Sequence, residues 1–261
     1  MEIIGFALGI LIGVSLGLTG SGGSILTIPV LVYFLHISPV SATTYSLFIV
    51  GFAALAGCIK GAKDNLLDYK MVLYFGLPSL LSTFMMRKFM VPLLPDTFFT
   101  LLGFTVTKNI FIMLVFAILM IFSSVYMLHK PTKLNQVINV DLKIIALRGL
   151  FVGLITGFVG VGGGFLIIPT LILSAKLPMN KAVATSLVIV ALNSLIGFIG
   201  SLGITQIEWK FLLVFTGFAV VGIFLGIHFS KKINSDKLKP AFGYFVLITG
   251  IYIIFKELLI K

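Results

Sequence analysis

A glycine-rich signature occurs twice in this chain, and the two copies lie 140 positions apart. The first reads GVSLGLTGSGGSILTIPVL, from Gly13 to Leu31, and the second reads GLITGFVGVGGGFLIIPTL, from Gly153 to Leu171. Aligned without a gap, nine of the 19 positions are identical, whereas unrelated segments would share roughly one or two. Each copy interrupts a long apolar stretch, and a duplicated, glycine-broken apolar segment is the best sequence indication of a transporter binding site.

The composition restricts the environment of such a chain to a lipid bilayer. Hydrophobic residues make up 59% of it and charged residues only 10%, against about 25% charged residues in soluble domains. The net charge of +11 does not indicate a nucleic-acid partner, because the Lys and Arg residues lie almost entirely in short loops between apolar runs. That pattern is typical of membrane orientation.

The lengths of the apolar runs predict an all-α polytopic membrane protein. Six runs approach or exceed the roughly 20 residues that a spanning helix needs, namely 40–60, 69–89, 108–129, 181–200, 209–229 and 240–259. The pieces around each signature are shorter, so they are either tilted thin spans or half-helices that enter the membrane and return. We expect eight to ten transmembrane or re-entrant helical segments, and an interfacial helix, or an extension of the helix that follows, near 97–106.

The halves define one transmembrane domain over residues 1–261, with repeat 1 at 3–130, a polar linker at 131–145 and repeat 2 at 146–259. Basic residues gather in the loop 60–70, around the linker and in the loop 230–240. All three groups lie on the cytoplasmic side only if equivalent loops of the two repeats face opposite sides. The sequence therefore predicts two inverted tandem repeats with glycine-broken helices, and both termini outside. Arg87 and Lys88 depart modestly from this charge rule.

The signatures are the first candidate for a binding site. A broken helix at membrane depth must line protein or water, and the helix that follows the break has a positive dipole end. Two such ends could hold an anion without a basic side chain, although small residues at this spacing also serve close helix packing. The candidate residues are Gly20, Ser21, Gly22, Gly23 and Ser24 in repeat 1, and Gly160, Val161, Gly162, Gly163 and Gly164 in repeat 2.

A polar stretch after each signature is the second candidate. Hydroxyl and amide donors suit oxyanions and cost less to bury than charges, but such hydroxyls also commonly bond their own helix backbone. The residues are Thr43, Thr44 and Ser46 in repeat 1, and Thr185, Ser186 and Asn193 in repeat 2. Pro29 and Pro169, one in each signature, are the expected structural hinges.

The sequence lacks the groups that other functions require. No Asp or Glu falls inside an expected span, so proton or sodium coupling through a buried carboxylate has no evident carrier. We find no metal-ligand spacing, no cofactor motif and no nucleophile–base pair. We therefore expect neither an enzyme, nor a cofactor, nor a metal site.

The two signatures, each followed by an Ala-x-x-Thr/Tyr-Ser stretch, resemble those of the TauE/SafE family of membrane permeases, over nearly the whole chain. The resemblance implies movement of sulfur-containing anions such as sulfite or sulfonates, commonly export, across the bacterial cytoplasmic membrane. Carried over, the family signature falls on Gly20, Gly22, Gly23 and Pro29, and on Gly160, Gly162, Gly163 and Pro169; the hydroxyl stretch falls on Ser46, Thr185 and Ser186.

These observations favour a secondary transporter of a small anion that works by alternating access. A passive anion channel, and a membrane scaffold whose glycines serve only packing, remain open. The exact substrate, direction, coupling ion and homo-oligomeric state also remain open.

Overall fold

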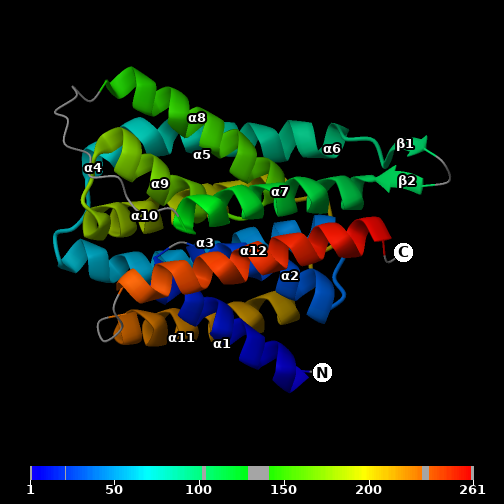
Figure 1. Cartoon of the computed structure of the whole chain (residues 1–261), viewed down its shortest axis with the longest axis horizontal. Coiled ribbons are helices and arrows are strands. Elements are labelled where there is room, and N and C mark those ends of the chain that lie inside the picture. Colours follow the sequence, from blue (N-terminus) through cyan, green and yellow to red (C-terminus); the bar gives the residue numbers. More distant parts are fainter. Residues whose placement is uncertain (1, 21, 102–103, 129–140, 231–234, 260–261) are drawn as a thin grey trace.

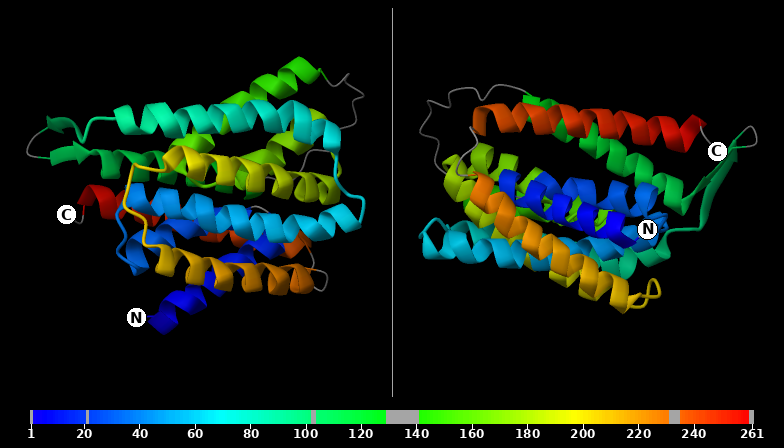
Figure 2. Two further views of the ribbon diagram at one scale, coloured as in Figure 1. Left: turned by 180° about the vertical axis from the view of Figure 1, so that it is seen from behind. Right: turned by 90° about the horizontal axis from the view of Figure 1, so that it is seen from below.

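The computed structural model describes residues 2–20, 22–101, 104–128, 141–230 and 235–259. Within these residues, helix fills ten stretches, most of them along the long axis of the molecule (Figures 1 and 2). Repeat 1 contains α1 (Glu2–Thr19), η1 (Gly22–Leu26), α2 (Thr27–Pro29), η2 (Val30–Phe34), α3 (Pro39–Lys63), α4 (Tyr69–Met71), η3 (Val72–Gly76), α5 (Leu77–Met85), η4 (Met86–Met90), α6 (Val91–Leu93) and α7 (Lys108–Leu128). Elements α4 to α6 form one continuous helix, called the α4–α6 helix below, and η1, α2 and η2 form another.

Repeat 2 contains α8 (Leu142–Val159), α9 (Gly164–Ala175), α10 (Met179–Ser201), α11 (Trp209–Ser230) and α12 (Ser235–Leu259). Five helices of the described chain, α3, α7, α8, α10 and α11, are long and apolar enough to cross a membrane. The protein is therefore an all-α polytopic membrane protein, as predicted. At 12 residues, α9 is only about 18 Å long, against about 30 Å for the hydrocarbon core.

The principal helix pairs join the two halves reciprocally. Helix α1 packs mainly against α11, and its counterpart α8 packs mainly against the α4–α6 helix, which is the counterpart of α11. The same exchange is visible in single contacts: a Cβ on Gly13 would meet the carbonyl oxygen of Ala219, and a Cβ on Gly153 would meet that of Ser79. Both members of the second pair lie 140 positions from those of the first. The remaining pairs join equivalent helices, α3 with α10 and α7 with α12.

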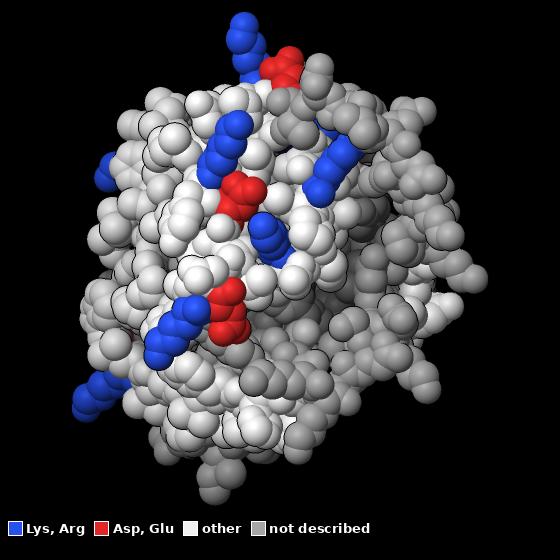
Figure 3. Space-filling model, turned by 90° about the vertical axis from the view of Figure 1, so that its left-hand side faces the viewer, with Lys and Arg blue, Asp and Glu red and all other residues white. Residues whose placement is uncertain are grey.

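One end of the molecule carries many basic side chains (Figure 3). Helix α1 begins and α12 ends at one end of the long axis (Figure 1). At the opposite end, α3 finishes with Lys63, α8 begins near Lys143 and α10 begins near Lys181 (Figure 1). Figure 3 views that end and shows Lys and Arg side chains spread over it, with acidic side chains between them. We call it the basic end and the other the terminal end.

The segment expected to be an interfacial helix is a β-hairpin instead. Strands β1 (Thr97–Leu101) and β2 (Phe104–Thr107) pair antiparallel, with Thr100 opposite Thr105. The helix prediction was wrong because this segment consists mainly of Thr, Phe and Val, which are β-branched or aromatic and fit a pleated strand better than a helix.

Two apolar clusters enclose the interior. The larger one joins α1, α3, α10 and α11, and includes Leu16, Ile49 and Phe215. The smaller one places Ile25 and Phe165, the residues just after the two glycine breaks, beneath α7 and α12. The breaks are therefore covered by helices on both sides, and the interior around them is shielded from lipid.

Candidate functional site

The second signature forms a tight break between α8 and α9. Helix α8 ends at Val159 and is capped by Gly160, whose φ is 78°, and α9 begins after Gly163, whose φ is 82°. These left-handed conformations are readily available only to glycine. Residues 160 to 165 are all buried, so the break lies inside the protein, as its glycine content predicts. The positive end of α9 therefore starts in the interior.

The first signature forms the equivalent break between α1 and η1. Gly20 has a φ of 86° and lies against Val183, and its counterpart Gly160 lies against Thr43. Helix η1 contacts α9, so the two breaks meet in the interior. Ser24 after the first break is fully buried. Ser21 lies outside the described residues, and of Gly22 and Gly23 the structure describes only that they begin η1.

An arginine that the sequence marked only as a modest departure from the charge rule, and that was not among the predicted site residues, lies at the second break. Arg87, in η4, has no exposed surface. Its Nη1 donates to Thr43 Oγ1 over 3.1 Å, and its Nη2 donates weakly to the carbonyl oxygen of Phe158 over 3.5 Å. A Cβ on Gly160 would collide with Nη2, and a Cβ on Gly200 would lie 3.2 Å from the Cβ of Arg87. The guanidinium thus sits where α3, α8, α10 and the glycine break converge.

Nothing in the described structure neutralises this charge. Arg87 is the only charged residue among the buried side chains that the structure describes, and its Nε has no hydrogen-bond partner there. A buried unpaired charge is expensive, and inside a membrane it commonly marks a substrate or ion path. A basic side chain thus stands beside the break, so an anion that binds there would not depend on helix ends alone.

A row of buried polar side chains follows one face of the α4–α6 helix. Four buried residues with polar side chains occur at spacings of three and four along the α4–α6 helix: Ser79, Ser82, Thr83 and Arg87. Their counterparts on α11, 140 positions later, are Ala219, Gly222, Ile223 and Ile227. The α4–α6 helix therefore carries a polar row beside α8 and the second break, while the four equivalent positions of α11 carry no polar side chain.

A second polar group lies deeper along α10. The position that a Cβ on Gly162 would take is occupied by Ser194 Oγ, and that oxygen has no hydrogen-bond partner among the described atoms. Asn193 Nδ2 donates to Ser79 Oγ over 2.6 Å, while Asn193 Oδ1 is also buried without a partner. Asn193, predicted from sequence, thus lies beside the polar row of the α4–α6 helix, and Ser194 lies beside the break.

The predicted hydroxyls divide into three groups. Thr44 Oγ1 donates to the carbonyl oxygen of Val40, and Ser186 Oγ donates to that of Val183, so both bond their own helix backbone. Thr43 also bonds Val40 but accepts from Arg87, and Thr185 Oγ1 accepts from the backbone N–H of Asp68. Ser46 Oγ is buried without a described partner.

The remaining candidate residues lie at the breaks or in the helices that follow them. Val161 is buried in the smaller apolar cluster, and Gly164 is the first residue of α9. Pro29 ends α2 and is followed directly by the π-helix η2, and Pro169 lies inside α9. Each proline removes one backbone donor from its helix, and the role of both as hinges stays a prediction.

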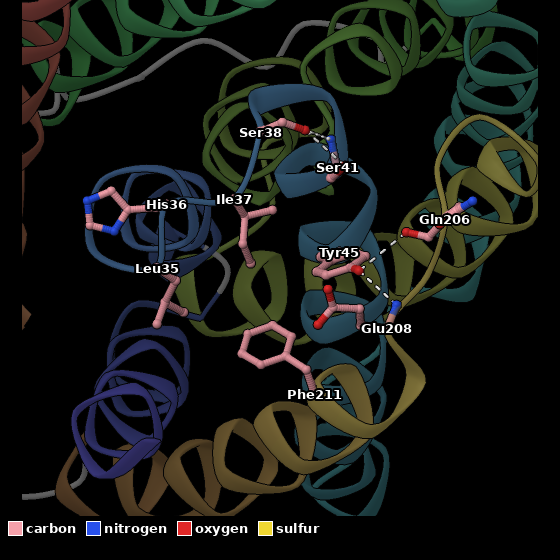
Figure 4. Close-up of a pocket in the computed structure, with 9 residues that line it drawn as sticks. All are labelled: Leu35, His36, Ile37, Ser38, Ser41, Tyr45, Gln206, Glu208 and Phe211. Carbon is pink, nitrogen blue, oxygen red and sulfur yellow. Dashed lines mark hydrogen bonds between the residues drawn. The ribbon is translucent and has the colours of Figure 1, made fainter. Parts of the chain in front are cut away.

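A cavity of about 400 Å³ opens at the terminal end, next to α3. Figure 4 shows that Tyr45 points into it, opposite Phe211 and the segment that carries Gln206 and Glu208. The other lining residues are Leu35, His36, Ile37, Ser38 and Ser41. Tyr45 lies two residues after Thr43, the hydrogen-bond partner of Arg87, on the same helix α3.

Residues 5–253 match the family model described as "Sulfite exporter TauE/SafE". Among curated proteins, a "Probable membrane transporter protein" of Xylella fastidiosa is 28% identical over 98% of this chain and 95% of its own length. The "Probable membrane transporter protein YunE" of Bacillus subtilis is 24% identical over 97% of both chains. No solved structure matches the chain.

Proposed function

Since the chain belongs to the TauE/SafE family of sulfite exporters, and is thus a membrane transporter, we propose that it moves a small sulfur oxyanion, such as sulfite or an organosulfonate, out of the cell by alternating access. The bacterial relatives suggest the cytoplasmic membrane as its location.

Arg87 is the observation that carries this proposal. Its guanidinium is buried, has no carboxylate partner in the described structure and retains an unpartnered Nε. Guanidinium groups bind oxyanions through several N–H donors in a planar fork. An anion bound here would neutralise the charge and also meet the positive end of α9. An anionic substrate would therefore offset a desolvation cost that no carboxylate of the described structure offsets.

The shape of the site favours an oxyanion over a halide. Around the break, Thr43 orients the guanidinium and Ser194 presents a buried hydroxyl toward Gly162. Donors that approach from different helices suit a ligand with several acceptor oxygens. The family description names sulfite, which has three such oxygens around sulfur.

A difference in charge between equivalent positions at the basic end and the terminal end supports export. At the basic end, Lys176 and Lys181 flank the start of α10, and their counterparts at the terminal end are His36 and Ser41. Positive charge at a mouth raises the local concentration of anions. If the basic end is cytoplasmic, as the charge rule predicts, it collects internal anions, and an inside-negative potential drives each out with about 2.3 kcal/mol per charge per 100 mV.

The reciprocal helix pairs support inverted repeats and alternating access. In Figure 1, the chain runs from the terminal end to the basic end in α7 and in the reverse direction in α12. Helices α1 and α8 exchange partners in the same way. Two repeats that are related like this can rock against each other and expose a central site to each side in turn.

Reconstitution in proteoliposomes tests the proposal. We expect uptake of labelled sulfite to be stimulated by unlabelled sulfite on the opposite side, because a carrier exchanges substrate across the membrane. Flux without this stimulation would identify a channel. A protein that neither transports sulfite or methanesulfonate nor is thermally stabilised by them would refute the sulfur-oxyanion assignment and favour a scaffold.

A further inference from the structure

At each end of the molecule, a side-chain hydroxyl of one repeat hydrogen-bonds the backbone of the other repeat. At the terminal end, Tyr45 of α3 accepts a hydrogen bond from the backbone N–H of Glu208 over 2.9 Å, and its hydroxyl lies 3.5 Å from the carbonyl oxygen of Gln206. At the basic end, Thr185 of α10 accepts one from the backbone N–H of Asp68 over 3.0 Å. Asp68 and Glu208 each precede the first helical residue, Tyr69 or Trp209, of their repeat's fourth helix.

The two bonds are equivalent in the repeat. Tyr45 and Thr185 lie 140 positions apart, as do Asp68 and Glu208. In both cases a helix of one repeat satisfies a backbone N–H that would otherwise have no partner in the first turn of the other repeat's helix. The same arrangement of bonds therefore recurs at the two ends of the molecule, although the side chain that makes it differs.

From this equivalence we propose that Tyr45 and Thr185 are the two gate residues of the transporter, and that they release alternately. The proposal rests on the alternating access proposed above. Both bonds are made in this structure, so it represents a state closed at both ends. Opening toward the terminal end breaks the Tyr45 bond and joins the cavity of Figure 4 to the interior, while opening toward the basic end breaks the Thr185 bond.

The position of Arg87 connects these gates to the substrate. Arg87 binds Thr43, two residues before Tyr45 on α3. Helix α3 also packs along α10, which carries Thr185. An anion that draws the guanidinium toward itself thus acts on the helix that holds one gate, and through the α3–α10 contact on the helix that holds the other.

The gates can be tested by paired removal of their hydroxyls. Tyr45→Phe and Thr185→Val delete one acceptor each and keep most of the side-chain shape. Tyr244→Phe and Thr249→Val, both on the outer helix α12, are matched controls. In a Cys58→Ser background, Ile49→Cys and Ile189→Cys report access, because each buried isoleucine lies one helical turn beyond a gate residue.

Each gate variant should raise labelling by a membrane-impermeant maleimide at the reporter beside its own gate. We expect Tyr45→Phe to raise labelling at position 49 from the terminal side about fivefold, and Thr185→Val to raise labelling at position 189 from the basic side by a similar factor. A fivefold change corresponds to the loss of about 1 kcal/mol, a typical net hydrogen-bond contribution. Each variant should also lower labelling at the other reporter.

Labelling that rises at both reporters in either variant would indicate general loosening and would overturn the proposal, as would labelling that matches the α12 controls. Sulfite flux is measured in the same vesicles. Normal sulfite flux with unchanged labelling refutes the gates alone. Reciprocal labelling in a protein that carries no sulfite refutes the substrate and leaves the gates intact.

Discussion

Replacing Arg87 by Gln should show separately how the buried charge affects the stability of the protein and how it affects sulfite binding. In the absence of substrate, Arg87 makes one good hydrogen bond, to Thr43, and one long contact, to the carbonyl of Phe158. Burying an unpaired ion costs several kcal/mol. Gln removes the charge and keeps an amide that can still donate to Thr43. We therefore expect Arg87→Gln to unfold at the same temperature as the wild-type protein or a higher one when no anion is present.

The same substitution should weaken sulfite binding, although it does not lower the stability of the protein without sulfite. Hydrogen bonds to charged groups contribute about 1.5–3 kcal/mol, so loss of the guanidinium should weaken binding about 100-fold. At a sulfite concentration of 100 times the wild-type Kd, the wild-type protein gains about 2.7 kcal/mol of stability by mass action, and the variant gains only about 0.4 kcal/mol. Thermal unfolding in detergent, with and without sulfite, measures both quantities.

Lys88→Gln is the matched control, since it removes the same charge from the next residue, which is exposed. It should leave the sulfite-induced shift unchanged. The reasoning would be refuted if Arg87→Gln were strongly destabilised without sulfite but still showed the wild-type shift with it. That result would make Arg87 a structural residue that the fold requires, with no part in holding an anion.

Three further substitutions test the packing and polarity of the breaks. Gly160→Ala should destabilise by about 2 kcal/mol more than Gly203→Ala, since both have positive φ but only at Gly160 would the Cβ also displace Arg87; equal thermal losses would contradict this. Gly13→Ala should cost about 1–3 kcal/mol through overpacking, whereas Gly217→Ala, with open space around its Cβ, should unfold at the wild-type temperature. Thr43→Val, which removes the hydroxyl that orients Arg87, should weaken sulfite binding about tenfold in a titration of unfolding temperature; wild-type affinity would argue against that role.

Much of the architecture could be predicted because it depends on local patterns. The breaks fall where the glycines cluster, since several of these glycines take positive φ values. The membrane environment follows from the lengths of apolar runs. The hairpin at 97–107 was missed because a short apolar segment does not distinguish strand from helix by periodicity alone.

Arg87 was misread because its environment is created by tertiary packing. In the sequence it stands near the end of an apolar run, where Lys and Arg are ordinary. In the structure the helix continues to Leu93, and α3, α8 and α10 cover the guanidinium. One signal was available: Ser79, Thr83 and Arg87 recur every fourth residue, while Ala219, Ile223 and Ile227 stand at the equivalent positions of repeat 2.

The exchange of helices between the halves also governs how this chain must be made. Helix α1 ends at Thr19, and its main partner α11 begins at Trp209, 190 residues later. At about 5–20 residues per second of synthesis, α1 waits roughly 10–40 s in the membrane with its glycine face uncovered. Helix α8 has no such delay, because the α4–α6 helix precedes it. Helix α1 is thus inserted long before its main partner exists, and the half that contains it cannot complete its packing until α11 has been synthesised.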